Sequence, residues 1–387
     1  MHLFLNVFII LLIITCLLLS LVMPAKADSP FSVASVAAEL LKTHHGNTVL
    51  HVIVQTDSSA TSGNLTTANA SKFVHGKIHS VAPKGGFIVA DVSPSEALAL
   101  THRSGISHVT FDWPVASTTA PPSNTSIVNS ASLGPDVARS YANVAWQNGV
   151  LGDGIGIAVV DSGIGINPDL KGGGLGGEKL VAWKDFVGGK NAPYDDYGHG
   201  THVAGILAGS GQMSTTYNTQ FPGIAPHANL IGVKVLDSTG AGTTSNVILG
   251  IDWCIQNAGA YKIRIINLSL GHPVYESYTT DPLCQEVENA WKAGIVVVVA
   301  AGNDGRLNAS TTSGVTDNCG YGTCYGSIES PGNDPSVITV GAMKSIDGNR
   351  ADDLIATYSS RGPTMGDDIL KPDIVAYGNL VTSLFDN

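Results

Sequence analysis

Residues 154–161 read GIGIAVVD, and this stretch decides the fold because its apolar residues follow one another without alternation. Such a run predicts a strand covered on both faces, since a strand with one wet face alternates apolar and polar residues. The same texture returns in ANLIGVKVLD at 228–237, IRIINLSL at 263–270 and IVVVVAAGN at 295–303. We therefore expect several buried strands that belong to one parallel sheet.

Helical segments separate these strands. The stretches HVAGILAG at 202–209, TTSNVILGIDWCIQN at 243–257 and CQEVENAWKAG at 284–294 each predict a helix between two predicted strands. This alternation indicates an α/β domain, a parallel sheet with helices on both faces. In such sheets the ligand lies beyond the carboxyl ends of the strands, so functional residues are expected at that edge.

A smaller unit with a different pattern precedes this domain. Strands are predicted at 47–57, 77–83, 86–93 and 108–113, and PSEALALTHRSG at 94–105 predicts a helix. We assign residues 28–115 to this small α+β domain. Residues 116–134, rich in Ser, Thr, Pro and Asn, predict an exposed linker with a processing site. Residues 135–387 form the α/β domain.

The first 27 residues predict a secretory signal peptide. The run from Leu3 to Met23 is almost continuously apolar, and Ala25 to Ala27 match the small-residue cleavage pattern. No Lys or Arg precedes the run, and the run is long enough to span a bilayer, so an anchor is the alternative. We expect cleavage after Ala27 and a secreted protein that no membrane holds.

Charge and cysteine content narrow the choice of function and compartment. The net charge is -11 and the pI about 5.4, with Lys and Arg scattered singly, which excludes a nucleic-acid partner. Cys319 and Cys324 flank a short turn and predict a local disulfide, which leaves Cys254 and Cys284 as a second pair or as two separate buried thiols. Neither pair has the spacing of a zinc site.

Three polar residues fall at the expected edge of the sheet. Asp161 ends its strand, His199 opens the helical segment after a glycine, and Asn303 follows the strand at 295–303. Each has a plain alternative: Asp161 and Asn303 could cap turns, and His199 could pair with His202 as a structural or metal-binding pair. The absence of H-E-x-x-H and of a nearby third ligand argues against zinc.

Together these motifs resemble the subtilisin-like serine proteases. DSGIG at Asp161, HGTHVAGI at His199 and AAGND at Ala300 match that family's signatures in the family's order. Further matches are SLG at 269–271, SSRGP at 359–363 and KPDIVA at 371–376, so the likeness covers about residues 138–376. The resemblance implies a subtilisin-like fold, and the preceding unit resembles the family's ferredoxin-like inhibitor propeptide.

The resemblance also implies roles. His199 would be the general base, Asp161 its orienting carboxylate, Asn303 the oxyanion donor and His202 a supporting residue. A polypeptide substrate would bind as an added strand, and the residues implied to contact it are Gly240, Ala241, Gly242, Ser269, Leu270 and Gly271. The alternative for the glycines and the alanine among them is a plain turn. The resemblance implies that catalysis requires no cofactor, leaves structural calcium ions open with no residues assigned to them, and implies that the propeptide acts as an intramolecular inhibitor.

The nucleophile of that family is missing from these 387 residues. The family carries it in G-T-S-M-A, which does not occur here, and Ser383 has only four residues after it, too few for a positioning helix. We expect an incomplete peptidase domain, inactive as given, from an ordinary secreted endopeptidase. The alternative is a non-catalytic scaffold of this fold or a propeptide-type inhibitor. A degenerate protease would be expected to lose catalytic residues at random positions, whereas here every missing motif would follow the last matched one.

Overall fold

The computed structural model describes residues 32–43, 47–57, 65–118, 137, 140–171, 178–217, 220–306, 322–344, 351 and 353–385. The predicted signal peptide, residues 1–27, lies outside the described residues, and so does most of the predicted linker. No helix in the described part of the chain is long and apolar enough to cross a membrane.

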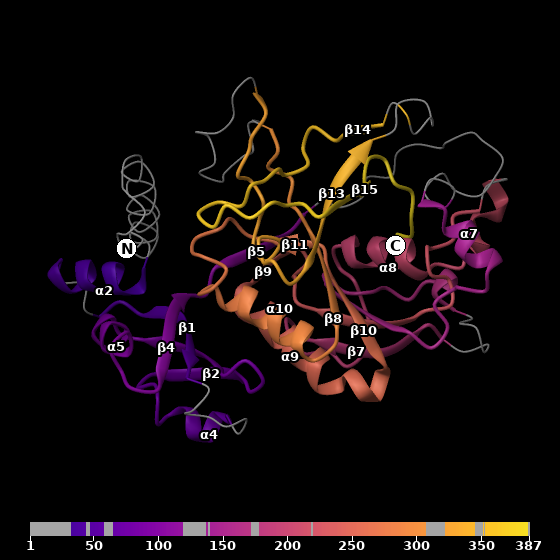
Figure 1. Ribbon diagram of the computed structural model, residues 1–387. Helices are drawn as coiled ribbons and strands as arrows, with labels where there is room; N and C mark the ends of the chain where they lie inside the picture. Colours follow the sequence, from indigo (N-terminus) through magenta and orange to yellow (C-terminus); the bar gives the residue numbers. More distant parts are fainter. Residues whose placement is uncertain are drawn as a thin grey trace.

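The N-terminal unit is an antiparallel sheet with helices packed on it (Figure 1). Its strands stand in the order β2 (Lys77–Ala82), β3 (Phe87–Val92), β1 (Leu50–Thr56) and β4 (Ile106–Phe111). Helices α2 (Val33–Lys42) and α5 (Pro94–Leu100) contribute Val33, Ala37, Ala97 and Leu100 to its core, and α4 (Thr67–Ala70) is a single turn. Ser93 caps α5 ahead of a proline at its first turn, as the sequence predicts.

The larger unit is built on an eight-stranded sheet. The order is β14 (Leu354–Ile355), β13 (Ile338–Lys344), β12 (Val296–Ala300), β10 (Ile263–Leu268), β6 (Gly156–Asp161), β8 (Asn229–Lys234) and β7 (Leu180–Asp185), and β15 (Ile374–Tyr377) also pairs with β13. All pairings are parallel except that of β13 with β14. The predicted parallel α/β architecture is confirmed.

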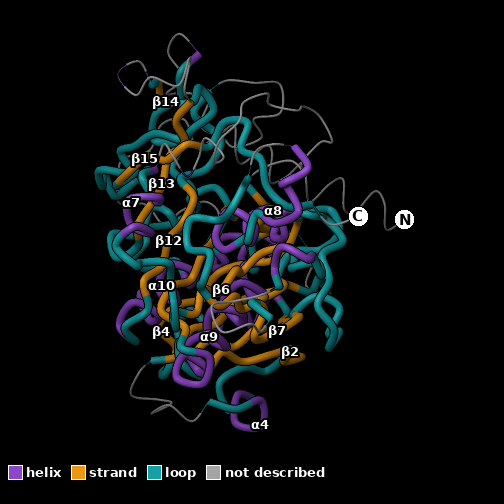
Figure 2. Tube along the Cα trace, turned by 90° about the vertical axis from the view of Figure 1, so that its right-hand side faces the viewer, coloured by secondary structure: helices purple, strands orange, loops and turns teal. Residues whose placement is uncertain are grey.

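Helices cover both faces of this sheet, which explains the unbroken apolar run in β6. Ala158 and Val160 face the core of α9 (Thr244–Tyr261) and α10 (Pro282–Lys292). Ile157 and Val159 face α8 (His199–Ala208). Figure 2 shows α8 across the sheet from α9 and α10. Short helices α7 (Ala142–Gln147), η1 (Pro168–Leu170) and η2 (Gln212–Tyr217) lie among the loops.

A third, three-stranded sheet joins the two units. Strand β5 (Pro114–Ser117) lies antiparallel between β11 (Leu270–Gly271) and β9 (Ala241–Thr243). The linker predicted to start at Ala116 therefore starts later, because Ala116 still pairs as a strand residue on both sides and Ser117 pairs with Leu270 of β11. The ladder of backbone hydrogen bonds holds this segment against the larger unit, although its composition is that of a loop.

Apolar contacts join the two units beneath that sheet. Ile53, Ala82 and Phe87 of the N-terminal unit belong to the same buried cluster as residues of α9 and α10. The turn before Phe87 fits closely, because a Cβ at Gly85 would lie 2.3 Å from the Glu286 carboxylate oxygen. At the edge of this interface the backbone N–H of Lys84 donates to the Asp252 side chain at 2.8 Å.

Of the two alternatives left open for Cys254 and Cys284, the structure has the separate buried thiols and not the disulfide. Cys254 on α9 and Cys284 on α10 are both free and buried. The thiol of Cys284 instead lies 3.3 Å from the Asn333 side-chain oxygen and 3.7 Å from the Ser330 hydroxyl. Helix packing buries both residues without a covalent link, as in the alternative of two separate thiols. Cys324 is disulfide-bonded, while its predicted partner Cys319 lies outside the described residues.

Candidate active site

The carboxyl end of β6 brings a carboxylate and an imidazole together. Asp161 is the last residue of β6 and is fully buried, and His199 is the first residue of α8. The distance between His199 Nδ1 and Asp161 Oδ1 is 2.7 Å, and the same oxygen accepts the Ser162 backbone N–H at 2.6 Å. Since an ionised carboxylate only accepts, Nδ1 carries the proton and Nε2 presents a lone pair.

The electrostatic surroundings favour a charged imidazole. Burial by itself would lower the pKa of His199, but the charge of Asp161, its hydrogen bond and the charge of Asp195 together raise the pKa above its ordinary value. An imidazolium is therefore stabilised at this position. These are the properties of a general base that must hold a proton briefly during a reaction.

Asp195 fixes the start of α8 and was not singled out in the sequence. Its Oδ1 accepts from the Gly198 N–H at 2.8 Å and the Ser162 hydroxyl at 2.9 Å. Its Oδ2 accepts from the Thr201 N–H at 2.8 Å and hydroxyl at 2.6 Å. The signal was present in YDDYGHGTH, where an acid stands just ahead of a helix start and can satisfy its free N–H groups.

A second restraint is steric. A Cβ at Gly200 would lie 2.1 Å from the Gly163 carbonyl oxygen, so the glycine of H-G-T-H lets α8 approach the turn after β6. Gly198 has φ 93, a left-handed conformation that side chains other than glycine rarely adopt. The two glycines that flank His199 thus permit the approach that places its ring on Asp161.

The two histidines of the motif have different partners. His202 turns away from Asp161, with its Nε2 3.3 Å from the Val381 carbonyl oxygen. Burial lowers the pKa of His202. Within the described ranges no group of three potential metal ligands includes either His199 or His202.

Asn303 lies three residues beyond β12, at the same edge of the sheet as Asp161 but two strands away. The backbone N–H of Asn303 donates to the carboxyl group of Glu329, and Asn303 is half-buried. No hydrogen bond joins its side chain to Asp161 or His199 in the described structure. Its predicted oxyanion role stays a prediction.

The hydroxyl of Ser383 points elsewhere. It donates to the His202 carbonyl oxygen at 2.7 Å, against the backbone of α8. The side chain lies so close to this helix that a Cβ at Gly205 would be 2.3 Å from its oxygen. Ser162, the other serine near the dyad, donates to Asp195.

The six residues predicted to contact substrate all flank strand β5. Ala116 pairs with Gly271 on one side and Ala241 on the other. Beyond it, the Ser117 N–H donates to the Gly240 carbonyl at 2.9 Å, and the Thr118 N–H donates to the Ser269 carbonyl at 3.1 Å. The remaining two, Gly242 and Leu270, pair with Val115 and Ser117.

Strand β5 runs toward the dyad. The Ser117 hydroxyl donates to the Tyr197 hydroxyl at 3.2 Å, and the rings of Tyr197 and His199 have centroids 6.4 Å apart. Gly240 (φ 77) also packs here, since a Cβ on it would lie 2.4 Å from the Tyr197 ring. A segment of the chain itself therefore pairs with the residues that were predicted to bind an extended peptide.

Glu329 is a carboxyl group next to Gly271 and Gly302 that sequence reasoning missed. A Cβ at Gly271 would lie 2.6 Å from its oxygen, and a Cβ at Gly302 would lie 2.7 Å from its carboxyl carbon. Burial, and secondarily the charge of Asp304, raise its pKa to about 8. No motif marks Glu329 in the sequence, because its role depends on the fold around it.

Comparisons with known proteins agree with this geometry. A profile described as the subtilase family matches residues 152–386. The serine protease AprX of Bacillus subtilis (strain 168) is 43% identical over 256 residues, covering 63% of this chain and 51% of AprX. Subtilisin DY of Bacillus licheniformis is 36% identical over 248 residues, covering 63% of this chain and 74% of the relative.

Subtilisin E of Bacillus subtilis (strain 168) is 36% identical over 240 residues, covering 62% of this chain and 51% of the relative. The chain thus spans about half the length of AprX and of subtilisin E. The region matched by the subtilase profile begins just before β6 and contains Asp161, His199 and Asn303.

Proposed function

Because the chain belongs to the subtilase family, we propose that it forms the base-carrying part of a serine endopeptidase that cleaves extended polypeptides. The observation that carries this proposal is the 2.7 Å contact between His199 Nδ1 and Asp161 Oδ1, which leaves Nε2 as a proton acceptor. His199 takes the proton of a serine hydroxyl as that oxygen attacks the peptide carbonyl. Asp161 holds the ring in place and stabilises the imidazolium, which then protonates the leaving amine.

Two further parts of the mechanism rest on the cleft. The peptide lies as an added strand between β9 and β11, where backbone groups of Gly240 and Ser269 already bond to β5. The side-chain amide of Asn303 donates to the developing oxyanion; removing one such donor costs about 2.7–4 kcal/mol in subtilisin. Each step uses side chains and backbone amides, so the proposed reaction requires no cofactor.

We propose that the 387-residue polypeptide alone does not hydrolyse peptides. The hydroxyls of Ser162 and Ser383 donate to Asp195 and to the His202 carbonyl, and neither is placed on Nε2 of His199. G-T-S-M-A does not occur in the sequence. A nucleophile must therefore reach His199 from a segment other than these.

A chimaera tests the proposal. Residues 28–385 are joined to the nucleophile-bearing C-terminal part of AprX, and hydrolysis of a denatured protein and labelling by a fluorophosphonate are measured. After the N-terminal unit of the chimaera has been cleaved off and removed, we expect both in the chimaera, neither in the 387-residue protein, and loss of both on His199→Ala. His102→Ala, an exposed histidine of the N-terminal unit, is the matched control and should keep activity. A chimaera that folds but stays unlabelled contradicts the assignment of the dyad.

We further propose that the N-terminal unit inhibits the site it covers, since β5 fills the cleft as a substrate would. Cleavage then falls between Ser117 and Gly134. The alternative function, an inhibitor of other proteases, is supported by the same strand. Adding the unit in trans to an active subtilase distinguishes them: inhibition only of its own peptidase domain favours the intramolecular role.

Export fits the chemistry of the chain. A disulfide at Cys324 is typical of proteins that fold in an oxidising compartment. We propose secretion, with the signal peptide at residues 1–27 removed after Ala27. N-terminal sequencing of the exported protein tests this, and a mature chain that still begins before Ala27 contradicts it.

A further inference from the structure

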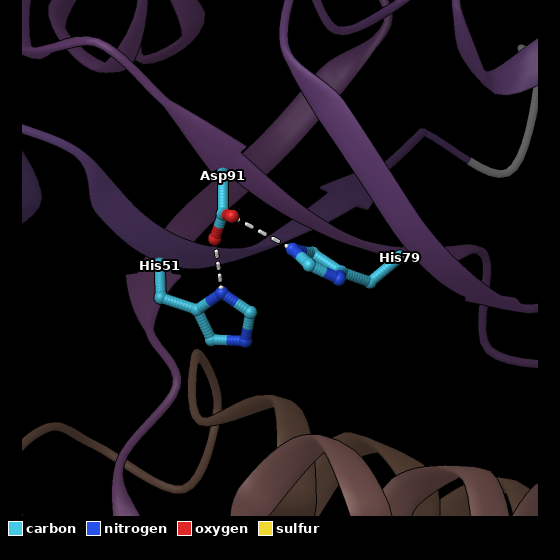
Figure 3. A group of neighbouring side chains, drawn as sticks. All are labelled: His51, His79 and Asp91. Carbon is cyan, nitrogen blue, oxygen red and sulfur yellow. Dashed lines mark hydrogen bonds and ion pairs between the residues drawn. The ribbon is translucent and has the colours of Figure 1, made fainter.

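Two histidines and one carboxylate converge on the sheet of the N-terminal unit, away from the active site. His51 on β1 and His79 on β2 approach Asp91 on β3, the strand between them (Figure 3). The distance from His51 Nδ1 to Asp91 Oδ1 is 2.6 Å, and that from His79 Nε2 to Asp91 Oδ2 is 2.9 Å. The three potential ligand atoms all lie within 4.8 Å of one another.

Strand register creates this cluster. His51 lies directly opposite Asp91 in the β1–β3 ladder. The β2–β3 ladder shifts register between Ile78 and Ser80, so the intervening His79 has no regular partner. Such an irregularity re-aims one side chain, and here the side chain reaches Asp91 on its own side of the sheet. Among the described residues this is the only trio of close potential metal ligands.

The outer nitrogen of His51 is also held. Its Nε2 lies 3.1 Å from the Asp112 carboxylate, whose side chain has no exposed surface. Asp112 in turn accepts from the Ser245 N–H at 2.8 Å and hydroxyl at 2.6 Å, at the start of α9. A histidine that binds a metal through one nitrogen usually donates its other N–H to a carboxylate, which fixes the ring and raises its basicity.

We propose that His51, His79 and Asp91 bind a divalent transition-metal ion of the zinc type, with Asp112 orienting the His51 ring. Two imidazole nitrogens and one carboxylate oxygen are ligands that zinc prefers, and water completes the tetrahedron. Calcium and magnesium require mainly oxygen ligands and are disfavoured by the two imidazoles.

The geometry needs little adjustment. Ligand atoms held about 2.0–2.1 Å from a tetrahedral ion lie about 3.3 Å from one another. The contacts of 2.6 and 2.9 Å between the Asp91 oxygens and the ring nitrogens must therefore lengthen by about 0.7 and 0.4 Å, and the two ring nitrogens, which lie within 4.8 Å of each other, must come to about the same separation; side-chain rotation supplies movements of this size. The side chains of His51 and His79 are 43% and 31% exposed, so an ion can enter from solvent.

The ion would act on the interface as well as on the sheet. Asp112 follows β4 in the N-terminal unit and bonds to Ser245 of the larger unit. An ion that locks the His51 ring therefore strengthens a chain of contacts running from the sheet to α9. Zinc should therefore raise the midpoint temperature of thermal unfolding of the protein in which the two units are in contact.

Equilibrium dialysis of the metal-free 387-residue protein against ZnCl₂ tests the site, with bound metal measured directly. We expect one ion per chain and a dissociation constant of about 10 μM or below. His79→Ala should abolish this binding, whereas His102→Ala, an exposed histidine outside the cluster, should leave it unchanged. Asp112→Asn should weaken binding about 10–100-fold, as outer carboxylates do.

Two measurements separate loss of the site from loss of fold. Circular dichroism of each variant must match the parent, and His79→Gln provides a second substitution at the same exposed position. Cobalt in place of zinc should give the strong visible absorption of a tetrahedral site. Binding weaker than about 100 μM, or binding that survives His79→Ala and His79→Gln, overturns the proposal and leaves an ion-paired cluster.

Discussion

Replacing Glu329 with glutamine should stabilise the protein at alkaline pH and leave its stability at acid pH nearly unchanged. Glutamine keeps the shape of the side chain between Gly271 and Gly302 but cannot ionise. The folded protein raises the pKa of Glu329 from 4.5 to about 8. The folded state therefore retains a proton that the unfolded state releases, so stability falls as pH rises from about 4.5 to about 8 and then levels off.

The magnitude follows from that interval. The gap between 4.5 and about 8 corresponds to at most about 4.8 kcal/mol, at about 1.36 kcal/mol per pH unit. Because the residue keeps partial exposure and water can reach the charge, we expect about half of this, roughly 2–3 kcal/mol. This exceeds the effect of most surface substitutions, which stay within about 0.5 kcal/mol.

Urea unfolding at pH 5 and pH 9 measures the effect. The free energy of unfolding of Glu329→Gln minus that of the parent should increase by about 2–3 kcal/mol between the two pH values. Glu39→Gln is the control, because Glu39 has a 52% exposed side chain on α2. An equal difference at both pH values would show that Glu329 ionises normally in the folded protein and would refute the reasoning.

Three more predictions follow from the site and its supports. Asp161→Asn removes the charge and the acceptor that raise the pKa of His199, so an NMR titration should show this pKa falling. Because the folded protein raises this pKa, the contact between Asp161 and protonated His199 stabilises the fold at pH values below the ordinary histidine pKa. That stabilisation is lost as the pH rises through the pKa of the folded protein. An unchanged titration would contradict the contact. Gly200→Ala forces a Cβ against the Gly163 carbonyl and should lower the free energy of unfolding by about 1–3 kcal/mol, which urea unfolding measures, whereas Gly259→Ala, with open space around its Cβ, should not. The 387-residue protein should self-associate in light-scattering measurements, because β13, β14 and β15 expose apolar side chains, namely Ile338, Leu354, Ile355, Ile374 and Val375. A stable monomer would count against this expectation.

The dyad could be predicted from the sequence because its signals are local. Asp161 ends an apolar run that predicts a covered strand, and His199 follows a glycine at a helix start. Parallel strands place their carboxyl ends at one edge, so the topology brings these residues together. Asn303 was placed at that edge for the same reason, but a rule of this kind fixes an edge of the sheet and not the direction of a side chain.

Features that depend on register and on contacts between units were missed. The linker boundary at Val115 was set from composition, but pairing partners far along the chain extend the strand through Ser117. The even count of cysteines leaves open whether Cys254 and Cys284 pair, and only the packing of α9 and α10 decides that each thiol is buried separately. Glu329 has no sequence signal at all, since only the fold places it between two glycines.

The contacts between the two units do not depend on the linker that joins them. Strand β5 is held by backbone hydrogen bonds on both sides, and Phe87 is buried in one cluster with residues of α9 and α10. Neither contact involves residues after Thr118. Cutting the chain beyond Thr118 therefore removes the covalent link without removing either contact, so the N-terminal unit should remain bound after processing. If the N-terminal unit inhibits the site as proposed, activity requires a later step that loosens β5 or breaks the Asp112–Ser245 contact, and the proposed ion at His51 would delay that step by stabilising this contact.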